Sequence, residues 1–363
     1  MKKSDFMVAF CYNVQPEGYD PEFDGEKYAE FDSRETVETI YNSLLDLGYV
    51  VTPIEFRNGF IEQLRQLKPD LVFNIVEGIQ GADREAQAPA IYEYLGLRYT
   101  GSRPMGHALA LDKVMAKRVM EHYGVRTAPF CVFDEPITSF NQSHMKFPMI
   151  IKPSCEGSSV GIDNNAKVDD IKALIFRVNY VIETYKQPAL VEQFIEGREF
   201  NQAIIGNKNP ILFPIVEIDY SYLPKGVNKF SSYEVKTSLD DPESTICPAN
   251  ITEEEAQRIG QATLGAYRAL GILDYARMDL RMDNEGNIYI LEVNSIPGIA
   301  PGEEENNSMP KAVREYGWTY TQMIGAIVDT ALERYGIVFE EEEETTISQM
   351  VDTRHIPPTL NGR

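Results

Sequence analysis

The sequence predicts an α/β protein whose C-terminal part is of the α+β type. Strand and helix signals alternate over residues 6–100, which is typical of a parallel sheet with helices packed on it. Two alternating runs joined by a turn signal at 283–286 predict an antiparallel hairpin within residues 277–300. The 363 residues are enough for two or three domains, each with its own core.

The elements before residue 100 follow from hydrophobic patterning. The apolar run at 6–10 predicts a first strand, and Asp32 with Glu35 three residues later predicts a helix that ends at Gly48. The same patterns then predict a strand at 49–56, a helix to 67, a buried strand at 70–76, a helix at 84–95 and a short strand at 97–100. Ligands bind beyond the carboxyl ends of parallel strands. Residues 77–81 follow such an end, so they either contact substrate or form only a tight turn.

The elements after residue 100 are mixed in type. The patterns predict helices at 111–123, 168–185 and 316–335 and strands at 130–133, 147–152 and 189–195. Thr252 with Glu255 three residues later is a capping-box signal for a helix that runs to about residue 270. The polar stretch 229–250 is predicted to be irregular, as either a functional lid or a disordered loop. The acidic and polar end of the chain, 339–363, predicts a mobile tail or a surface strap.

Composition excludes several classes of protein. The formal net charge of −22 argues against nucleic acid as a main partner, although a nucleotide needs only a few lysines. No run approaches the ~20 apolar residues that span a membrane, and the apolar run at 6–10 is too short for a signal peptide. The four cysteines are dispersed, which favours free thiols over disulfides or a zinc site. A cytoplasmic protein is expected.

The predicted hairpin carries a candidate metal site. If Met282 pairs with Asn287, Asp279 lies opposite Ile290 and Arg277 lies opposite Glu292. One face then presents Arg277, Asp279, Glu292 and Asn294, and the core face presents Met278, Leu280, Tyr289, Leu291 and Val293. Oxygen ligands of this kind suit Mg²⁺, and the arginine could hold a phosphate or an oxyanion. The alternative is a solvated face with a weak cross-strand ion pair.

Two further stretches carry candidate binding residues. Lys152 ends a strand and precedes the Gly/Ser-rich stretch 153–161, which either lays N–H groups over phosphate oxygens or is a plain surface turn. The order of residues is not that of a Walker loop. Glu192 and Glu199 could receive an adenine amino group and a ribose hydroxyl, or be two exposed acids that flank a turn.

These motifs together resemble the ATP-grasp superfamily, and within it the D-alanine–D-alanine ligases. The likeness covers roughly residues 70–336. It rests on ordered motifs at 99–102, 108–113, 151–161, 191–200, 233–236, 247–249 and 277–298. The resemblance implies four regions: an N-terminal parallel-sheet domain (1–103), two α+β subdomains that clasp ATP (104–190 and 191–336), and a C-terminal tail (337–363).

The resemblance also implies a role for each site residue. Lys113 and Lys152 would contact the α- and β-phosphates. Ser158, Ser159 and Lys236 would close on the γ-phosphate. Glu192, Phe194, Ile195 and Glu199 would bind the nucleoside. Asp279, Glu292 and Asn294 would hold two Mg²⁺ ions. Arg277 and the N–H of Gly298 would stabilise the tetrahedral oxyanion, and Ser158 and Lys236 join them in the catalytic set.

The implied reaction is phosphoryl transfer from ATP to an amino-acid carboxylate, followed by attack of an amine to form a peptide bond. A homodimer and a role in cell-wall peptidoglycan synthesis are also implied. The substrate contacts are assigned to Glu30, Glu77, Thr237 and Ser308.

The substrate half departs from the family pattern. Glu77 stands in place of a histidine, Arg84 ends a segment that in the family reads Gly-Glu-Asp-Gly, and Thr237 stands in place of a lid tyrosine. The segment 302–307 is longer and more acidic than in the family, and would favour a substrate with an extra cationic group if it covers the acceptor pocket. Two alternatives to D-alanine ligation therefore remain: a related ligase with other amino-acid or peptide substrates, and a non-catalytic nucleotide-binding protein.

Overall fold

Three β-sheets organise the chain in this computed structural model, which describes residues 2–141, 144–239, 241–302 and 306–339. The first sheet has the strand order β2-β1-β3 and is entirely parallel, as the alternation of strands and helices predicts. Its strands are β1 (Met7–Tyr12), β2 (Val50–Glu55) and β3 (Leu71–Ile75). Its helices are α2 (Arg34–Asp46), α3 (Phe60–Leu67) and α4 (Arg84–Leu95).

Two details of this region differ from the sequence prediction. Ser33, not Asp32, caps α2, because its side chain accepts a hydrogen bond from the N–H of Thr36. The predicted strand at 97–100 is only an isolated bridge between Val72 and Tyr99. A short helix, α1 (Pro21–Asp24), and a 3₁₀ turn at 25–28 occupy the loop after β1.

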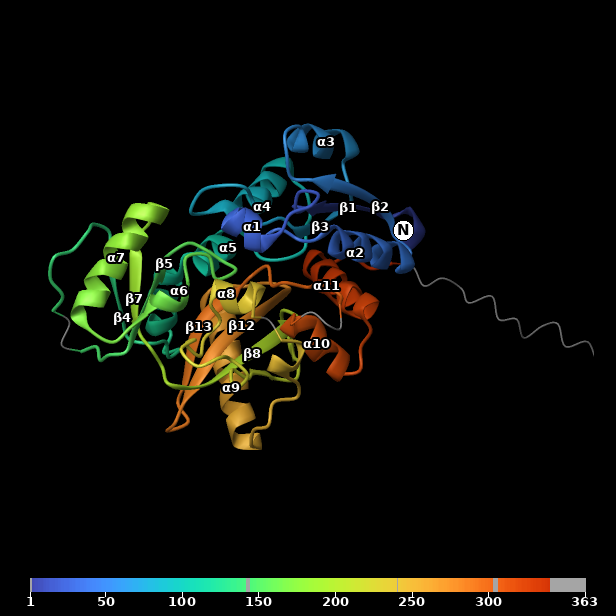
Figure 1. Cartoon of the computed structure of the whole chain (residues 1–363). Helices are drawn as coiled ribbons and strands as arrows, with labels where there is room; N and C mark the ends of the chain where they lie inside the picture. The colour runs from blue at the N-terminus through green and yellow to red at the C-terminus, as the bar shows by residue number, and fades with distance from the viewer. Residues whose placement is uncertain (1, 142–143, 240, 303–305, 340–363) are drawn as a thin grey trace, which may run out of the picture.

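A four-stranded antiparallel sheet with the order β4-β7-β5-β6 forms the second layer, and α7 (Ile171–Tyr185) packs on it (Figure 1). Its strands are β4 (Phe130–Phe133), β5 (Met149–Pro153), β6 (Lys167–Val168) and β7 (Ala189–Gln193). The domain boundary predicted at residue 190 lies inside β7. We propose to move that boundary to the end of β7, since its hydrogen bonds join it to this sheet.

The predicted helix 111–123 corresponds to α6 (Lys113–His122), and a second helix that was not predicted, α5 (Pro104–Leu111), precedes it. Asp112 separates them, and its side chain accepts hydrogen bonds from the N–H groups of Val114 and Met115 at the start of α6. This cap fixes where Lys113 enters the site.

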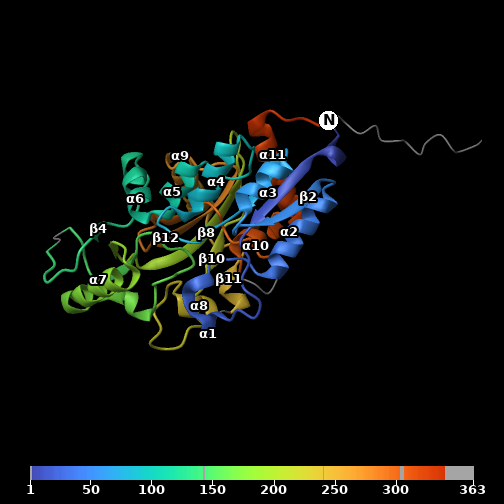
Figure 2. The same cartoon turned by 90° about the horizontal axis from the view of Figure 1, so that it is seen from above.

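A six-stranded antiparallel sheet lies between the other two layers (Figures 1 and 2). Its strands are β8 (Gly197–Ile205), β9 (Ile211–Leu212), β10 (Val216–Ile218), β11 (Thr245–Ile246), β12 (Tyr275–Asp283) and β13 (Ile288–Asn294). The helices of this part are α8 (Tyr233–Thr237), α9 (Glu253–Ala269), α10 (Ser308–Glu315) and α11 (Tyr320–Tyr335). The capping box at Thr252 and Glu255 is confirmed.

The C-terminal helices differ from the sequence prediction. The predicted helix 316–335 begins later, at the Thr319 cap, and α10 precedes it. Together, α10 and α11 pack into one core with the first sheet, so the beginning and the end of the chain stabilise each other. Phe339 continues this packing against Phe6. The rest of the predicted tail, 340–363, lies outside the described residues. In the described part of the chain, no helix combines the length and apolar character needed to cross a membrane.

Candidate active site

A cleft of about 610 Å³ lies where the three layers meet. It is lined by every residue that the sequence assigns to catalysis, nucleotide binding or metal binding. Of the predicted substrate residues, Glu30, Glu77 and Ser308 line the cleft and Thr237 does not. The hydroxyl of Thr237 instead donates to the carbonyl of Tyr233 within α8, at 2.9 Å. The fold therefore brings the predicted residues together, while their individual roles stay predictions.

The hairpin of β12 and β13 differs in register from the sequence prediction. Met282 pairs with Ile288 rather than with Asn287, and a β-bulge leaves Leu291 without a partner, so Arg277 pairs with Asn294 and Asp279 with Glu292. The bulge turns both Leu291 and Glu292 toward the cleft. The predicted core face is therefore wrong for Leu291. It is also wrong for Tyr289, whose hydroxyl donates to Asp283 at 3.2 Å.

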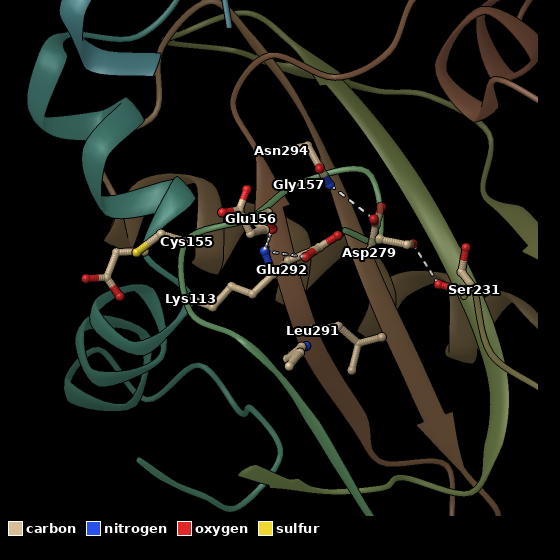
Figure 3. A network of polar contacts seen from close by, with 12 residues as sticks. Lys113, Cys155, Glu156, Gly157, Ser231, Asp279, Leu291, Glu292 and Asn294 are labelled. Carbon is tan, nitrogen blue, oxygen red and sulfur yellow. Dashed lines mark hydrogen bonds and ion pairs between the residues drawn. The ribbon is translucent and has the colours of Figure 1, made fainter. Parts of the chain in front are cut away.

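The predicted metal-binding side chains lie on one face of the hairpin (Figure 3). Asn294 Nδ2 donates to Asp279 Oδ2 at 3.1 Å, and Arg277 makes two hydrogen bonds to Asp279, at 2.7 and 2.9 Å. Asn201 from β8 donates to the same carboxylate at 2.8 Å. In the described part of the chain, no three acidic, histidine or cysteine side chains are grouped as a metal site. Two carboxylates and an amide fit an ion that takes its remaining oxygen ligands from a phosphate.

Glu292 faces three lysines. Lys113 Nζ lies 3.2 Å from Glu292 Oε2 and also donates to the carbonyl of Glu156 (Figure 3). Burial alone would raise the pKa of Glu292, but Lys113, Lys152 and Lys236 outweigh it and hold the pKa far below its usual value. Glu292 is therefore an anion at any pH near neutrality, as a cation ligand must be.

Glu192 lines the cleft and is buried between two lysines. Lys152 Nζ lies 2.6 Å from Glu192 Oε2, and Lys117 contacts the other oxygen. Burial would raise the pKa of Glu192, but the two lysines lower it below its usual value. The contacts of this carboxylate in the structure are with lysines, so the expected contact with adenine stays a prediction.

Apolar and aromatic side chains line the cleft next to Glu199. Phe194 packs between two cations, with Lys167 Nζ and the Arg281 guanidinium each 4.5 Å from the ring centroid. Glu199 accepts a hydrogen bond from the Tyr220 hydroxyl at 2.8 Å. Ile195 and Leu291 complete the apolar wall on this side. A planar nucleotide base that lies next to the Glu199 carboxylate would fit this environment.

The Gly/Ser-rich loop is held by acidic residues from the N-terminal part of the chain. The N–H of Gly157 donates to Glu30 at 2.8 Å, and the N–H of Gly161 donates to Glu26 at 2.9 Å. Ser158 and Ser159 adopt left-handed backbone angles, with φ of 45° and 60°. The Ser159 hydroxyl donates to the carbonyl of Ser231, at 2.7 Å.

The stretch 229–250 is more regular than predicted. It contains α8, a 3₁₀ turn and β11, and Val235 is buried. Lys236 lies on α8 and lines the cleft. Partial loss of water inside the cleft lowers the pKa of Lys236, although the residue is exposed, and Arg277 lowers it further.

Arg84 was noted in the sequence only as a departure from a family pattern, yet it joins two sides of the cleft. It donates to both oxygens of Glu30, at 2.8 and 2.5 Å, and to the carbonyl of Cys155 at 2.8 Å. It also lies 3.1 Å from Glu156. Nothing in the local sequence could identify this role, because its partners are more than 50 residues away in the chain.

The remaining substrate-side residues surround the hairpin end. Ser308 donates to Asn201 Oδ1 at 2.6 Å. A Cβ on Gly298 would lie 2.6 Å from Asn307 Oδ1, so no larger residue fits without rearrangement there. Residues 303–305 of the acidic stretch lie outside the described residues, and whether the stretch covers the pocket stays a prediction.

Glu77 lies in an acidic part of the cleft. Burial raises the pKa of Glu77 well above its usual 4.5, and Glu85, Glu30 and Asp32 raise it further. The folded protein therefore binds this proton more tightly than the unfolded chain does. Stability is then lost as the pH rises from about 4.5 through the raised pKa.

Glu77→Gln should therefore stabilise the protein near neutral pH. At about pH 8 its melting temperature should exceed that of the wild type, and the difference should vanish by about pH 4, where Glu77 is protonated in both states. Melting curves of both proteins across this range measure the effect. Glu62→Gln, a change on the solvent side of α3, is the matched control and should show no such pH dependence. A gain that persists at about pH 4 would contradict this account.

A family comparison adds to this geometry. The family model described as D-ala D-ala ligase C-terminus matches residues 119–329, more than half of the chain.

The chain belongs to the D-alanine–D-alanine ligase family.

This ligase is also similar to individual proteins over most of its length. It is 32% identical to the uncharacterized protein y4sG of Sinorhizobium fredii, over 82% of this chain and 88% of that protein. It is 30% identical to a D-alanine–D-alanine ligase of Pelotomaculum thermopropionicum, over 84% of this chain and 93% of that protein. The crystal structure of the D-alanine–D-alanine ligase of Bacillus anthracis superposes with a TM-score of 0.70 at 21% identity, over 91% of this chain and 99% of that one. The expected ATP-grasp fold and the enzyme class, an ATP-dependent ligase, are confirmed.

Proposed function

We propose that this ligase activates an amino-acid carboxylate with ATP and couples it to an amine. The carboxylate oxygen attacks the γ-phosphorus, ADP leaves, and an acyl phosphate forms. The amine nitrogen then attacks the acyl carbon, loses a proton and expels inorganic phosphate, which leaves a peptide bond. The observation that carries this proposal is the convergence of Lys113, Lys152 and Lys236 with Asp279 and Glu292 in one cleft.

The charges in the cleft suit phosphoryl transfer. This reaction needs little covalent help from a protein and depends on positioning and on neutralising negative charge. Lys113 and Lys152 supply fixed cations, and Lys236 supplies one from α8. Arg277 and the N–H of Gly298 would face the oxyanion that forms when the amine attacks.

Asp279, Glu292 and Asn294 would hold Mg²⁺, two ions in the arrangement that the sequence predicts. A bound Mg²⁺ neutralises charge on the phosphate oxygens as the γ-phosphoryl group moves. In the structure Glu292 contacts Lys113 and Asp279 contacts Arg277, so a metal ion at these carboxylates would leave Lys113 for the phosphates and Arg277 for the oxyanion. Assembly as a homodimer is part of this proposal.

Ligation of two D-alanine molecules is the first candidate, because the relatives carry that name. A ligase with other amino-acid or peptide substrates is the second, and specific observations favour it. Glu30, which was expected to hold the first amino group, is already paired with Arg84. Glu77 and Glu85 make the adjoining wall acidic, and Thr237 points away from the cleft.

Release of ADP separates these candidates. The enzyme is incubated with ATP and Mg²⁺, with D-alanine alone and with pairs drawn from a panel of D- and L-amino acids, and ADP is measured by a coupled assay. We expect turnover with a pair that contains a cationic amino acid to exceed that with D-alanine alone. Glu292→Gln gives the background from contaminating ATPases. The highest rate with D-alanine alone would refute the broader-substrate candidate. No ADP release with any pair would refute catalysis and favour a nucleotide-binding role.

A further inference from the structure

We propose that Lys117 is a positioning residue of this active site. It holds Lys152, the proposed phosphate ligand, and Glu292, the proposed metal ligand, in place and contacts neither substrate. The proposal rests on the use of ATP proposed above. Lys117 is on α6, one turn after Lys113, and its side chain is completely buried. It does not line the cleft. Lys113, by contrast, lines the cleft.

The first contact of Lys117 is with Glu192. Two lysines share this buried carboxylate, Lys117 on one oxygen and Lys152 on the other. Lys117 neutralises part of the negative charge of Glu192. Glu192 therefore attracts Lys152 less strongly, and Lys152 can also bind an anionic ligand in the cleft. Without Lys117, Glu192 would hold Lys152 as its remaining cation and draw it away from the phosphates.

The second contact of Lys117 is with the bulge in β13. Its Nζ lies 3.3 Å from the carbonyl of Leu291, the residue that the bulge leaves unpaired. It also donates to the Thr127 hydroxyl at 2.6 Å, and that hydroxyl donates to the carbonyl of Ile290 at 3.0 Å. An unpaired buried carbonyl needs a donor. Lys117 therefore supports the bulge that turns Glu292 into the cleft.

A purely structural role would give different results. A buried ion pair is weak evidence for stability, and replacing it with apolar groups can be neutral. A positioning role predicts that nucleotide affinity falls even where the protein stays fully folded. Groups that orient the ligands of a site typically change affinity or activity by about 10–100-fold when removed.

The test compares Lys117→Met with Arg118→Met, which removes an exposed cation from the next position of the same helix. The dissociation constant of ADP with Mg²⁺ is measured by calorimetry without amino acids, so its result does not depend on which peptide bond the enzyme makes. In Lys117→Met the dissociation constant and the KM for ATP should rise about 10-fold or more, and the KM for the amino-acid substrates should change much less. Arg118→Met should match the wild type.

A second variant separates this effect from misfolding. Lys117→Gln leaves Glu192 paired with Lys152 and keeps a hydrogen-bond donor near the carbonyl of Leu291, and should melt near the wild-type temperature while still binding ADP about 10-fold more weakly. Wild-type ADP affinity in either folded variant would overturn the proposal. So would an equal rise in the KM values for ATP and for the amino acids. Failure of both variants to fold would assign Lys117 to stability alone and would equally overturn it.

Discussion

Replacing Glu292 by alanine should abolish ATP turnover and leave the fold intact. Glu292 lies on the cleft side of the β13 bulge, within reach of Lys113, and three lysines keep it ionised. Loss of a carboxylate that holds a catalytic cation removes several kcal/mol of transition-state stabilisation. That loss corresponds to a rate lower by about 100-fold or more. Steady-state ADP release at saturating ATP and Mg²⁺ measures it.

The control for this prediction is on the same hairpin. Glu285 occupies the exposed turn between β12 and β13, so Glu285→Ala removes a carboxylate from the same element without touching the cleft. It should keep wild-type activity. Near-normal turnover by Glu292→Ala would show that the metal assignment is wrong. Equal melting temperatures of the two variants are needed to exclude a loss of fold.

Local patterns predicted the elements of this site but not their exact alignment. The turn at 283–286 and the alternation around it were enough to place Asp279, Glu292 and Asn294 on one face of a hairpin. The bulge at Leu291 could not be predicted, because its carbonyl is bonded by Lys117 from α6, a helix far away in the sequence. The turn shifts the pairing by one residue, since Met282 pairs with Ile288, and the bulge shifts it by one more, so the predicted partners of Arg277 and Asp279 were wrong.

The contacts of the expected substrate residues were even harder to predict from local patterns. Glu30 was expected to receive an amino group, because the family resemblance implies a glutamate with that role in this early loop. Arg84 pairs with it instead, across 54 residues of chain. Among the short helices that were missed, α5 and α10 are each 8 residues long and depend on tertiary packing, so hydrophobic periodicity had little to detect.

Arg84→Met should destabilise the protein and strongly reduce its activity. Arg84 is buried and holds Glu30, Glu156 and the carbonyl of Cys155 together. Removing one partner of a buried ion pair leaves an uncompensated charge and costs about 3–5 kcal/mol. The same change frees the loop that begins at Cys155 from the N-terminal part of the chain. Chemical denaturation measures the first effect and ADP release the second.

Two comparisons separate the cost of an unpaired buried charge from the loss of the contacts that Arg84 makes. Arg57→Met is the matched control, since it removes an arginine from an exposed pair with Glu55 in the same domain and should change stability by less than about 1 kcal/mol. Arg84→Met combined with Glu30→Gln removes the unpaired carboxylate and should regain part of the lost stability. Activity should not return, because the second change also takes the ionised partner of the Gly157 N–H away, and the loop would still lack the contacts of Arg84. If Arg84→Met is as stable as Arg57→Met, the contacts of Arg84 contribute little to stability. The Gly/Ser-rich loop must then be held by the hydrogen bond from Ser159 to the carbonyl of Ser231.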